Sequence, residues 1–96
     1  MRLITRNAHD AFNAGKRFKS RNTEVRFNDG VLTMYLHDRA IAKKEQDGIY
    51  ISDGGYGFSR TTQERLKAFR INLRGNKKRW IRDEKFLWDG NWMKIN

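Results

Sequence analysis

Apolar and polar residues alternate along two neighbouring stretches in the first half of the chain, residues 22–28 and 31–37. A period of two is typical of strands that bury one face, and Val25 and Phe27 would share the buried face of the first strand. Asn28-Asp29-Gly30 stands between the two stretches and is a strong signal for a tight turn. These positions therefore predict a β-hairpin.

Two further strands are predicted after this hairpin, over residues 40–45 and 49–52. Asp47-Gly48 supplies a turn between them, because glycine adopts the positive φ angle that many tight turns require. Lys16 to Arg21 precedes the hairpin and is predicted to be a basic loop. Four strands joined by short turns would form an antiparallel meander.

Apolar residues at helical spacing predict one short helix on each side of this meander. The first would have Thr5 as its capping residue and would end at Gly15. The second would begin at Thr61, which lies three residues before Glu64 in a capping-box pattern. The buried stripe of the second helix would consist of Leu66 and Phe69.

Short apolar runs separated by turn residues follow the second helix and predict three or four further strands. These runs cover residues 71–74, 78–82, 86–88 and 91–95. The whole chain, residues 1–96, would then form a single basic α+β domain. In this domain two short helices pack on an antiparallel sheet of about seven to eight short strands joined as hairpins and meander.

The composition fits a small folded domain with a strongly basic surface. Of the 96 residues 12% are aromatic, which is enough for a hydrophobic core, and the formal net charge is +10. Cysteine is absent, which excludes disulfides, thiolate metal sites and cysteine nucleophiles. The N-terminus has no apolar signal segment and no run is long enough to span a membrane, which predicts a soluble intracellular protein.

Positive charge is concentrated in two segments. Residues 65–82 contain eight Lys and Arg and no Asp or Glu, and residues 16–21 contain four Lys and Arg and no acidic residue. Cations without internal partners favour binding to a polyanion, of which nucleic acid is the commonest. The alternative for both segments is a solvated surface that keeps the protein soluble. The candidate contacts are an N-terminal basic cluster (Lys16, Arg17, Lys19 and Arg21) and a C-terminal basic cluster (Arg70, Arg74, Lys77, Lys78, Arg79 and Arg82).

Three tyrosines, Tyr35, Tyr50 and Tyr56, are candidates to stack on unpaired bases, although a role in covering the outer face of the sheet is favoured for them. No helix-turn-helix pattern is present and a zinc knuckle needs cysteine, so charge-led binding of RNA is favoured over sequence-specific reading of DNA. Gly54-Gly55-Tyr56-Gly57 precedes the second helix, where glycines can hold a phosphate. Its spacing matches neither nucleotide-binding glycine motif, which favours a plain turn.

Catalytic chemistry has few candidates in this sequence. His9 and His37 are the only histidines, and two histidines could cleave RNA by general acid–base catalysis. Nothing in the sequence brings them together, so we expect no catalytic residues and no enzyme. We also expect no metal site and no cofactor, because each candidate aspartate suits a turn or a helix position better; these are Asp10, Asp29, Asp38 and Asp53.

Short motifs spread over nearly the whole chain resemble a family of small accessory proteins of tailed bacteriophages. The motifs are Thr5-Arg6-Asn7-Ala8, Asn22-Thr23-Glu24-Val25, Tyr35-Leu36-His37 and Thr61-Thr62-Gln63-Glu64-Arg65-Leu66. The resemblance carries over no catalytic residues. It implies a factor that acts in the bacterial host cytoplasm, of the kind that binds and neutralises a host enzyme or defence system.

Charge and resemblance together predict a non-enzymatic phage protein that binds RNA. As a counter-defence factor it would neutralise a host complex of the toxin-ribonuclease type, with RNA involved. The alternative is an inhibitor whose basic face docks directly on an acidic host enzyme without RNA. Neither hypothesis involves binding to a membrane, and neither specifies the oligomeric state of the protein.

Overall fold

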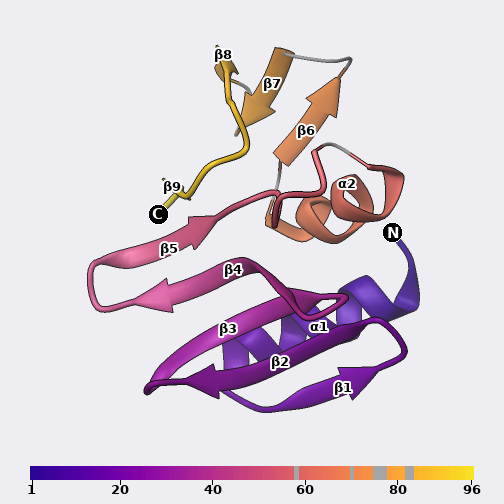
Figure 1. Cartoon of the computed structure of the whole chain (residues 1–96), viewed down its shortest axis with the longest axis vertical. Coiled ribbons are helices and arrows are strands. Elements are labelled where there is room, and N and C mark those ends of the chain that lie inside the picture. The colour runs from indigo at the N-terminus through magenta and orange to yellow at the C-terminus, as the bar shows by residue number, and fades with distance from the viewer. Residues whose placement is uncertain (58, 70, 75–77, 82–83) are drawn as a thin grey trace.

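The structure is a computed structural model of the whole chain, and it describes residues 1–57, 59–69, 71–74, 78–81 and 84–96. Within residues 71–87 it describes the backbone of the strands. Figure 1 shows two sheets with a helix between them and a second helix on the larger sheet. The α+β class predicted from the sequence is confirmed.

The larger sheet has six antiparallel strands in the order β1-β2-β3-β4-β5-β9. Its first five strands follow the chain as a meander, and the last returns from the C-terminus to pair with β5. The predicted four-strand meander is therefore confirmed, with β1 and β9 added at its two edges. The strands are β1 Phe18–Ser20, β2 Thr23–Asn28, β3 Val31–Leu36, β4 Arg39–Glu45, β5 Gly48–Ile51 and β9 Met93–Lys94.

Strand β1 corrects the predicted basic loop over Lys16 to Arg21. Phe18 pairs with Val25 of β2, and Ser20 pairs with Thr23. Phe18 packs against the core beside α1, which the sequence pattern did not predict because one apolar residue among cations gives no alternation. The N-terminal basic cluster therefore lies along the edge of a sheet.

The predicted hairpin at Asn28-Asp29-Gly30 is confirmed. Asn28 pairs with Val31, which leaves a two-residue turn of Asp29 and Gly30 with φ angles of 51° and 80°. Two consecutive positive φ angles match the right-handed twist of the flanking strands. Phe27, predicted to share the core face with Val25, is instead 47% exposed because β2 extends past the packed part of the sheet at this hairpin.

Helix α1 (Leu3–Ala14) covers one face of β1, β2 and β3. Ala8 and Phe12 are fully buried against the sheet, and Gly15 ends the helix with a φ of 70° as predicted. The predicted cap was wrong, because the helix begins three residues earlier and Arg2 occupies the N-cap position without a side-chain cap. Thr5 lies within the first turn and is 1% exposed.

Helix α2 (Arg60–Leu66) continues into a 3₁₀ turn, η1 (Lys67–Phe69). Its cap is Ser59, whose hydroxyl accepts a hydrogen bond of 3.2 Å from the backbone N–H of Thr62, so the prediction of Thr61 as cap was wrong. Leu66 and Phe69 are buried as predicted. The Phe69 ring meets the Phe12 ring edge-on at 5.5 Å between centroids, which joins η1 to α1.

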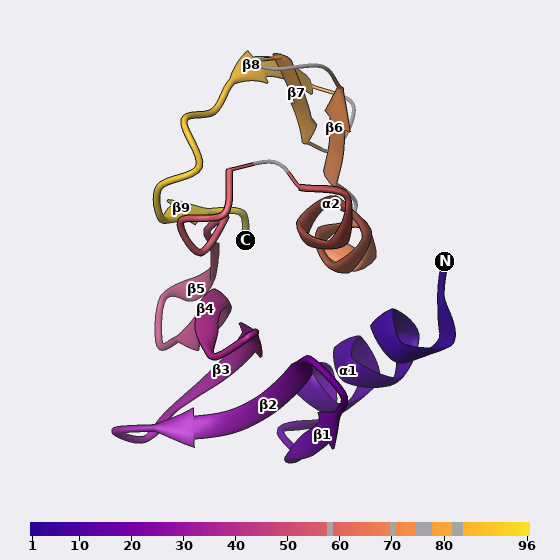
Figure 2. The same ribbon diagram turned by 45° about the vertical axis from the view of Figure 1, so that its right-hand side comes forward.

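A smaller antiparallel sheet follows α2 and has the strand order β6-β7-β8. In Figures 1 and 2 it lies on the other side of α2 from β1 to β4. Three members of the C-terminal basic cluster, Arg74, Lys78 and Arg79, belong to strands of this sheet, which lies at the opposite end of the molecule from β1. The strands are β6 Ile71–Arg74, β7 Lys78–Ile81 and β8 Glu84–Leu87.

Candidate nucleic-acid interface

The N-terminal basic cluster is presented by the connection from α1 to β2. Lys16 and Arg17 lie between α1 and β1, Lys19 is the middle residue of β1, and Arg21 opens the turn into β2. All four side chains are exposed. Because β1 is an edge strand, they follow an open border of the sheet where a partner can approach without displacing another strand.

None of these four cations forms an ion pair with a carboxylate whose side chain the structure describes. The described ion pairs lie elsewhere and join Arg26 to Glu24, Lys43 to Glu45, Lys67 to Glu64 and Lys94 to Asp47. Their N–O distances run from 3.3 to 3.9 Å, and such exposed pairs contribute at most about 1 kcal/mol each. The positive charge of the N-terminal basic cluster is thus not compensated within the described part of the molecule.

Arg21 has an unusual backbone conformation in this cluster. Ser20 and Thr23 pair across a two-residue turn, and Arg21 occupies its first position with a φ of 52°. A residue with a Cβ lowers the stability of the fold by on the order of 1 kcal/mol when its φ angle is in this region, and hairpins usually place glycine there. The turn places Arg21 between two hollows, one on each face of the sheet.

The C-terminal basic cluster is described only in part. Arg74 ends β6 and is the register partner of Lys78, which begins β7, and Arg79 faces Leu73 across the same hairpin. The structure describes the backbone at these three cationic positions. Three further members lie outside the described residues, namely Arg70, Lys77 and Arg82.

Arg65 corrects the prediction that the cations of residues 65–82 all lack internal partners. Its side chain leaves α2 toward the larger sheet, and the residue is only 2% exposed. Nε donates to Thr23 Oγ1 at 2.8 Å, Nη1 to Thr5 Oγ1 at 3.0 Å and Nη2 to Asn22 Oδ1 at 3.2 Å. One guanidinium therefore links α2 to α1 and to the beginning of β2.

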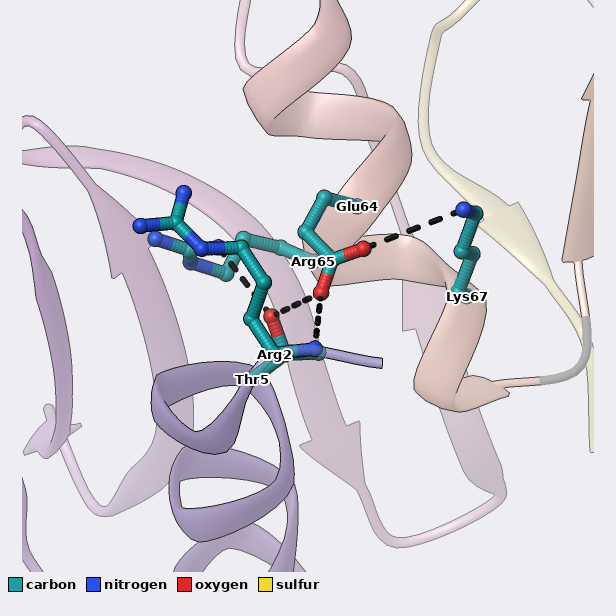
Figure 3. Close-up of polar contacts among 5 residues, drawn as sticks. All are labelled: Arg2, Thr5, Glu64, Arg65 and Lys67. Atoms are coloured by element: carbon teal, nitrogen blue, oxygen red, sulfur yellow. Dashed lines mark hydrogen bonds and ion pairs between the residues drawn. The ribbon is translucent and has the colours of Figure 1, made fainter.

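Glu64, the neighbour of Arg65, makes a second link between the helices (Figure 3). Its Oε1 accepts hydrogen bonds from the Arg2 backbone N–H at 2.7 Å and from the Thr5 hydroxyl at 2.9 Å. Burial alone would raise the pKa of Glu64. These two hydrogen bonds and the charges of Lys67 and the N-terminus outweigh burial, so the pKa of Glu64 lies below its ordinary value.

The pKa of Arg65 is lowered from its ordinary value, first by burial and then by the positive charge of Arg2. Figure 3 shows the guanidinium groups of Arg2 and Arg65 extending from the helices in the same direction. Arg65 donates to neutral oxygens, and the negative charge of Glu64, which bonds the same Thr5 hydroxyl, opposes part of this lowering. The structure thus brings two guanidinium groups together where no described carboxylate bonds either one.

The model of the Kyanoviridae Gp96 protein family matches residues 1–94 of the chain. The chain belongs to this family. The expected phage family is therefore confirmed. Searches of the curated proteins and of the solved structures found no match.

The predicted stacking tyrosines of this Gp96 family member are engaged in internal contacts. Tyr35 is 6% exposed, so little of it can reach a base, and the Arg26 guanidinium lies 4.1 Å from its ring centroid. The Tyr50 hydroxyl donates to Asp47 at 2.7 Å. The Tyr56 hydroxyl donates to the carbonyl of Leu36 at 2.8 Å and so supports the β3–β4 turn.

The glycine segment before α2 forms an ordinary turn in the described residues. The amide of Gly54 donates to Ser52 Oγ at 3.1 Å, that of Gly55 to Asp53 Oδ1 at 2.7 Å, and that of Tyr56 to the Asp53 carbonyl at 3.1 Å. These amides already have acceptors within the chain. The segment is therefore a plain turn before α2, as its spacing favoured, rather than a phosphate-binding loop.

The two histidines contact different parts of the molecule. His9 lies edge-on to the Phe69 ring at 4.9 Å, and burial lowers its pKa despite the nearby charge of Asp10. His37 lies in the β3–β4 turn with a φ of 49°, next to the Tyr56 ring. Among the described residues no group of three His, Cys, Asp or Glu could hold a metal, and no helix is long and apolar enough to cross a membrane.

Sequence reasoning missed the polar cluster around Arg65. Arg65 precedes Phe69 by four residues and follows Thr62 by three, which places it on the buried face of α2. That spacing was a usable signal. The contributions of Arg2 and Asn22 gave no local signal, because their relation to α2 arises only when the chain folds.

Proposed function

We propose that this protein is a non-enzymatic phage accessory protein that binds RNA through the N-terminal basic cluster. The supporting observation is a set of four exposed cations on a sheet edge, none paired with a described carboxylate. Such cations gain free energy by displacing the counterions condensed on a phosphate backbone. Of the three candidate tyrosines Tyr35 is buried and Tyr50 and Tyr56 are half-buried, which favours recognition of the backbone over recognition of bases.

This mode of binding has a calculable salt dependence. Each phosphate contact with single-stranded nucleic acid contributes about 0.7 to the slope of log K against log salt. Four contacts would give a slope of about −2.8, so the affinity would fall about 50-fold between 50 and 200 mM salt. A protein that recognised bases chiefly through hydrogen bonds or stacking would show a shallower slope.

Two quadruple variants locate the surface, because they remove the same amount of charge from two different segments of the chain. One replaces the N-terminal basic cluster by glutamine, and the matched control replaces Arg74, Lys77, Lys78 and Arg79. Binding to a fluorescent single-stranded RNA is measured by anisotropy at several salt concentrations. We expect the first variant to lose most of the affinity and the salt slope, while the second keeps them. Equal affinities of parent and first variant at 150 mM salt would refute the assignment of this surface.

The biological role we propose is counter-defence in the host cytoplasm, by neutralising a host complex of the toxin-ribonuclease type in which RNA takes part. Membership of a phage family and the uncompensated charge support this role. Affinity capture from infected cells, with and without nuclease treatment, tests it. A captured host protein that is lost after nuclease treatment is held through RNA, as proposed.

Direct docking on an acidic host protein is the second candidate function, and one observation favours it. Phe27 is 47% exposed and lines a hollow of about 420 Å³ together with Arg17 and Arg26. An exposed aromatic ring beside arginines is typical of the residues that dominate protein interfaces. Retention of the captured host protein after nuclease treatment, and its loss on Phe27→Ala, would replace the RNA proposal by this one.

A further inference from the structure

A polar hollow of about 450 Å³ lies between the first turn of α1 and the turn from β1 to β2. We name it the arginine pocket, because three of its lining residues are arginines contributed by three different segments of the chain. Its volume is in the range of small-molecule sites. The lining residues are Arg2, Leu3, Ile4, Asn7, Phe18, Ser20, Arg21, Asn22 and Arg65.

The lining chemistry of the arginine pocket is cationic and rich in donors. None of the nine described residues that line it carries a carboxylate. Asn7, Ser20 and Asn22 add amide and hydroxyl groups, and α1 has neither an acidic residue in its first turn nor a side-chain cap at its N-terminus. The Glu64 carboxylate accepts hydrogen bonds at the first turn of α1 but does not line the pocket, so the charged groups of the pocket wall itself favour an anion over a cation.

Arg65 is the strongest reason to expect a bound anion. A guanidinium has five N–H donors, and the three hydrogen bonds of Arg65 use one donor on each nitrogen. One N–H on each of Nη1 and Nη2 therefore has no described acceptor. Arg65 is 2% exposed and lies beside a second cation, Arg2, whose effect on it is larger than that of the opposing charge of Glu64, so a bound anion would compensate charge that Glu64 leaves uncompensated.

We propose that the arginine pocket binds the phosphate group of a nucleotide-sized phosphomonoester. Planar guanidinium groups bind phosphate oxygens through paired hydrogen bonds, which suits a pocket with three of them. The apolar side chains of Leu3, Ile4 and Phe18 line the same hollow and provide a surface for the organic part of the ligand. The phosphate could belong to a free nucleotide or to the 5′ end of a strand, and the experiment below separates these sources.

This inference does not depend on the RNA-binding proposal, although Arg21 belongs to both surfaces. The test variant is therefore Asn7→Asp, which introduces a carboxylate into the pocket without altering the N-terminal basic cluster. Asn7 is exposed and lies in the first turns of α1, where an acidic residue favours the helix, so the variant should fold. Gln46→Glu makes the same change of charge at an exposed turn outside the pocket and serves as the matched control.

Binding is measured with adenosine monophosphate, inorganic phosphate and one RNA oligonucleotide carrying either a 5′-phosphate or a 5′-hydroxyl. We expect the parent and Gln46→Glu to bind adenosine monophosphate more tightly than inorganic phosphate, and Asn7→Asp to lose about tenfold or more. Tighter binding of the 5′-phosphorylated oligonucleotide assigns the site to strand ends. Binding of the mononucleotide without that preference assigns it to free nucleotides.

The proposal is overturned if neither the mononucleotide nor the 5′-phosphate gives binding that Asn7→Asp weakens more than Gln46→Glu does. It is also overturned if inorganic phosphate binds as tightly as adenosine monophosphate, because the pocket would then not recognise the organic part. The 5′-hydroxyl oligonucleotide separates the two proposals. The binding of this oligonucleotide depends on the N-terminal basic cluster alone. It can therefore be absent while the mononucleotide still binds, or be present while the mononucleotide does not bind.

Discussion

Replacing Thr5 by valine tests the polar connection between the two helices. Thr5 is 1% exposed, and its hydroxyl accepts from Arg65 Nη1 at 3.0 Å while donating to Glu64 Oε1 at 2.9 Å. Valine has nearly the same shape and a similar helix propensity, so the substitution removes the hydroxyl and little else. The two partner groups, the guanidinium of Arg65 and the carboxylate of Glu64, are charged, and the substitution removes neither of them.

The expected cost follows from these two hydrogen bonds. A hydrogen bond to a charged group contributes about 1.5–3 kcal/mol, but Glu64 is partly accessible to water and keeps its bond from Arg2. We therefore expect Thr5→Val to lower the free energy of unfolding by about 2–4 kcal/mol. For a domain of this size that corresponds to a fall in Tm of at least about 10 °C.

The measurement is urea and thermal unfolding followed by circular dichroism. Thr33→Val is the matched control, because Thr33 is 4% exposed and its hydroxyl makes one hydrogen bond of 3.0 Å, to the neutral carbonyl of Val31. It should cost about 1 kcal/mol or less. Thr5→Ser keeps the hydroxyl and should recover most of the loss. If Thr5→Val unfolds no more easily than Thr33→Val, the polar connection does not stabilise the fold as argued.

Two further predictions follow from local features of the fold. The pKa of Glu64 is lowered in the folded state, so the stability that its carboxylate contributes is complete above its ordinary pKa of 4.5 and is lost as the pH falls through the folded pKa. Glu64→Gln should therefore flatten the acid side of a plot of Tm against pH, and an unchanged plot would contradict this. Gly30 has a φ of 80° with open space around its Cβ position, so Gly30→Ala should cost about 1 kcal/mol of unfolding free energy through backbone strain alone. Gly30→Asn should cost less in the same urea titration, since asparagine tolerates this conformation.

Local patterns predicted the meander, because apolar and polar residue types alternate along its central hairpin and the turns carry their own signals. Asn28-Asp29-Gly30 determined both the turn and the register of the first hairpin. Strand β1 escaped prediction because Phe18 alone anchors it, and the cations around it suggested a loop. An edge strand needs only one buried face and few residues, so its sequence carries little periodic information.

The candidate site was predictable in its charge but not in its arrangement. Counting cations identified both basic clusters, yet the sequence does not show which cations acquire partners. Thr5 was interpreted as a helix cap, because the local signal for a cap is strong while its partners Glu64 and Arg65 lie about sixty residues away. Arg65 was counted among cations without partners, whereas tertiary packing buried it.

The charge of this protein therefore has two distinct physical consequences. At the N-terminal basic cluster the cations face water, so added salt screens them and weakens any polyanion bound there. At the arginine pocket Arg65 is buried, so screening by sodium chloride relieves little of its charge, whereas a phosphate bound in the pocket compensates it directly. A ligand that binds only the folded state raises stability by about 1.4 kcal/mol at ten times its dissociation constant. Phosphomonoesters should thus still raise the Tm at ionic strengths where RNA binding has already weakened. The difference in salt dependence between these two effects distinguishes the two sites on one molecule.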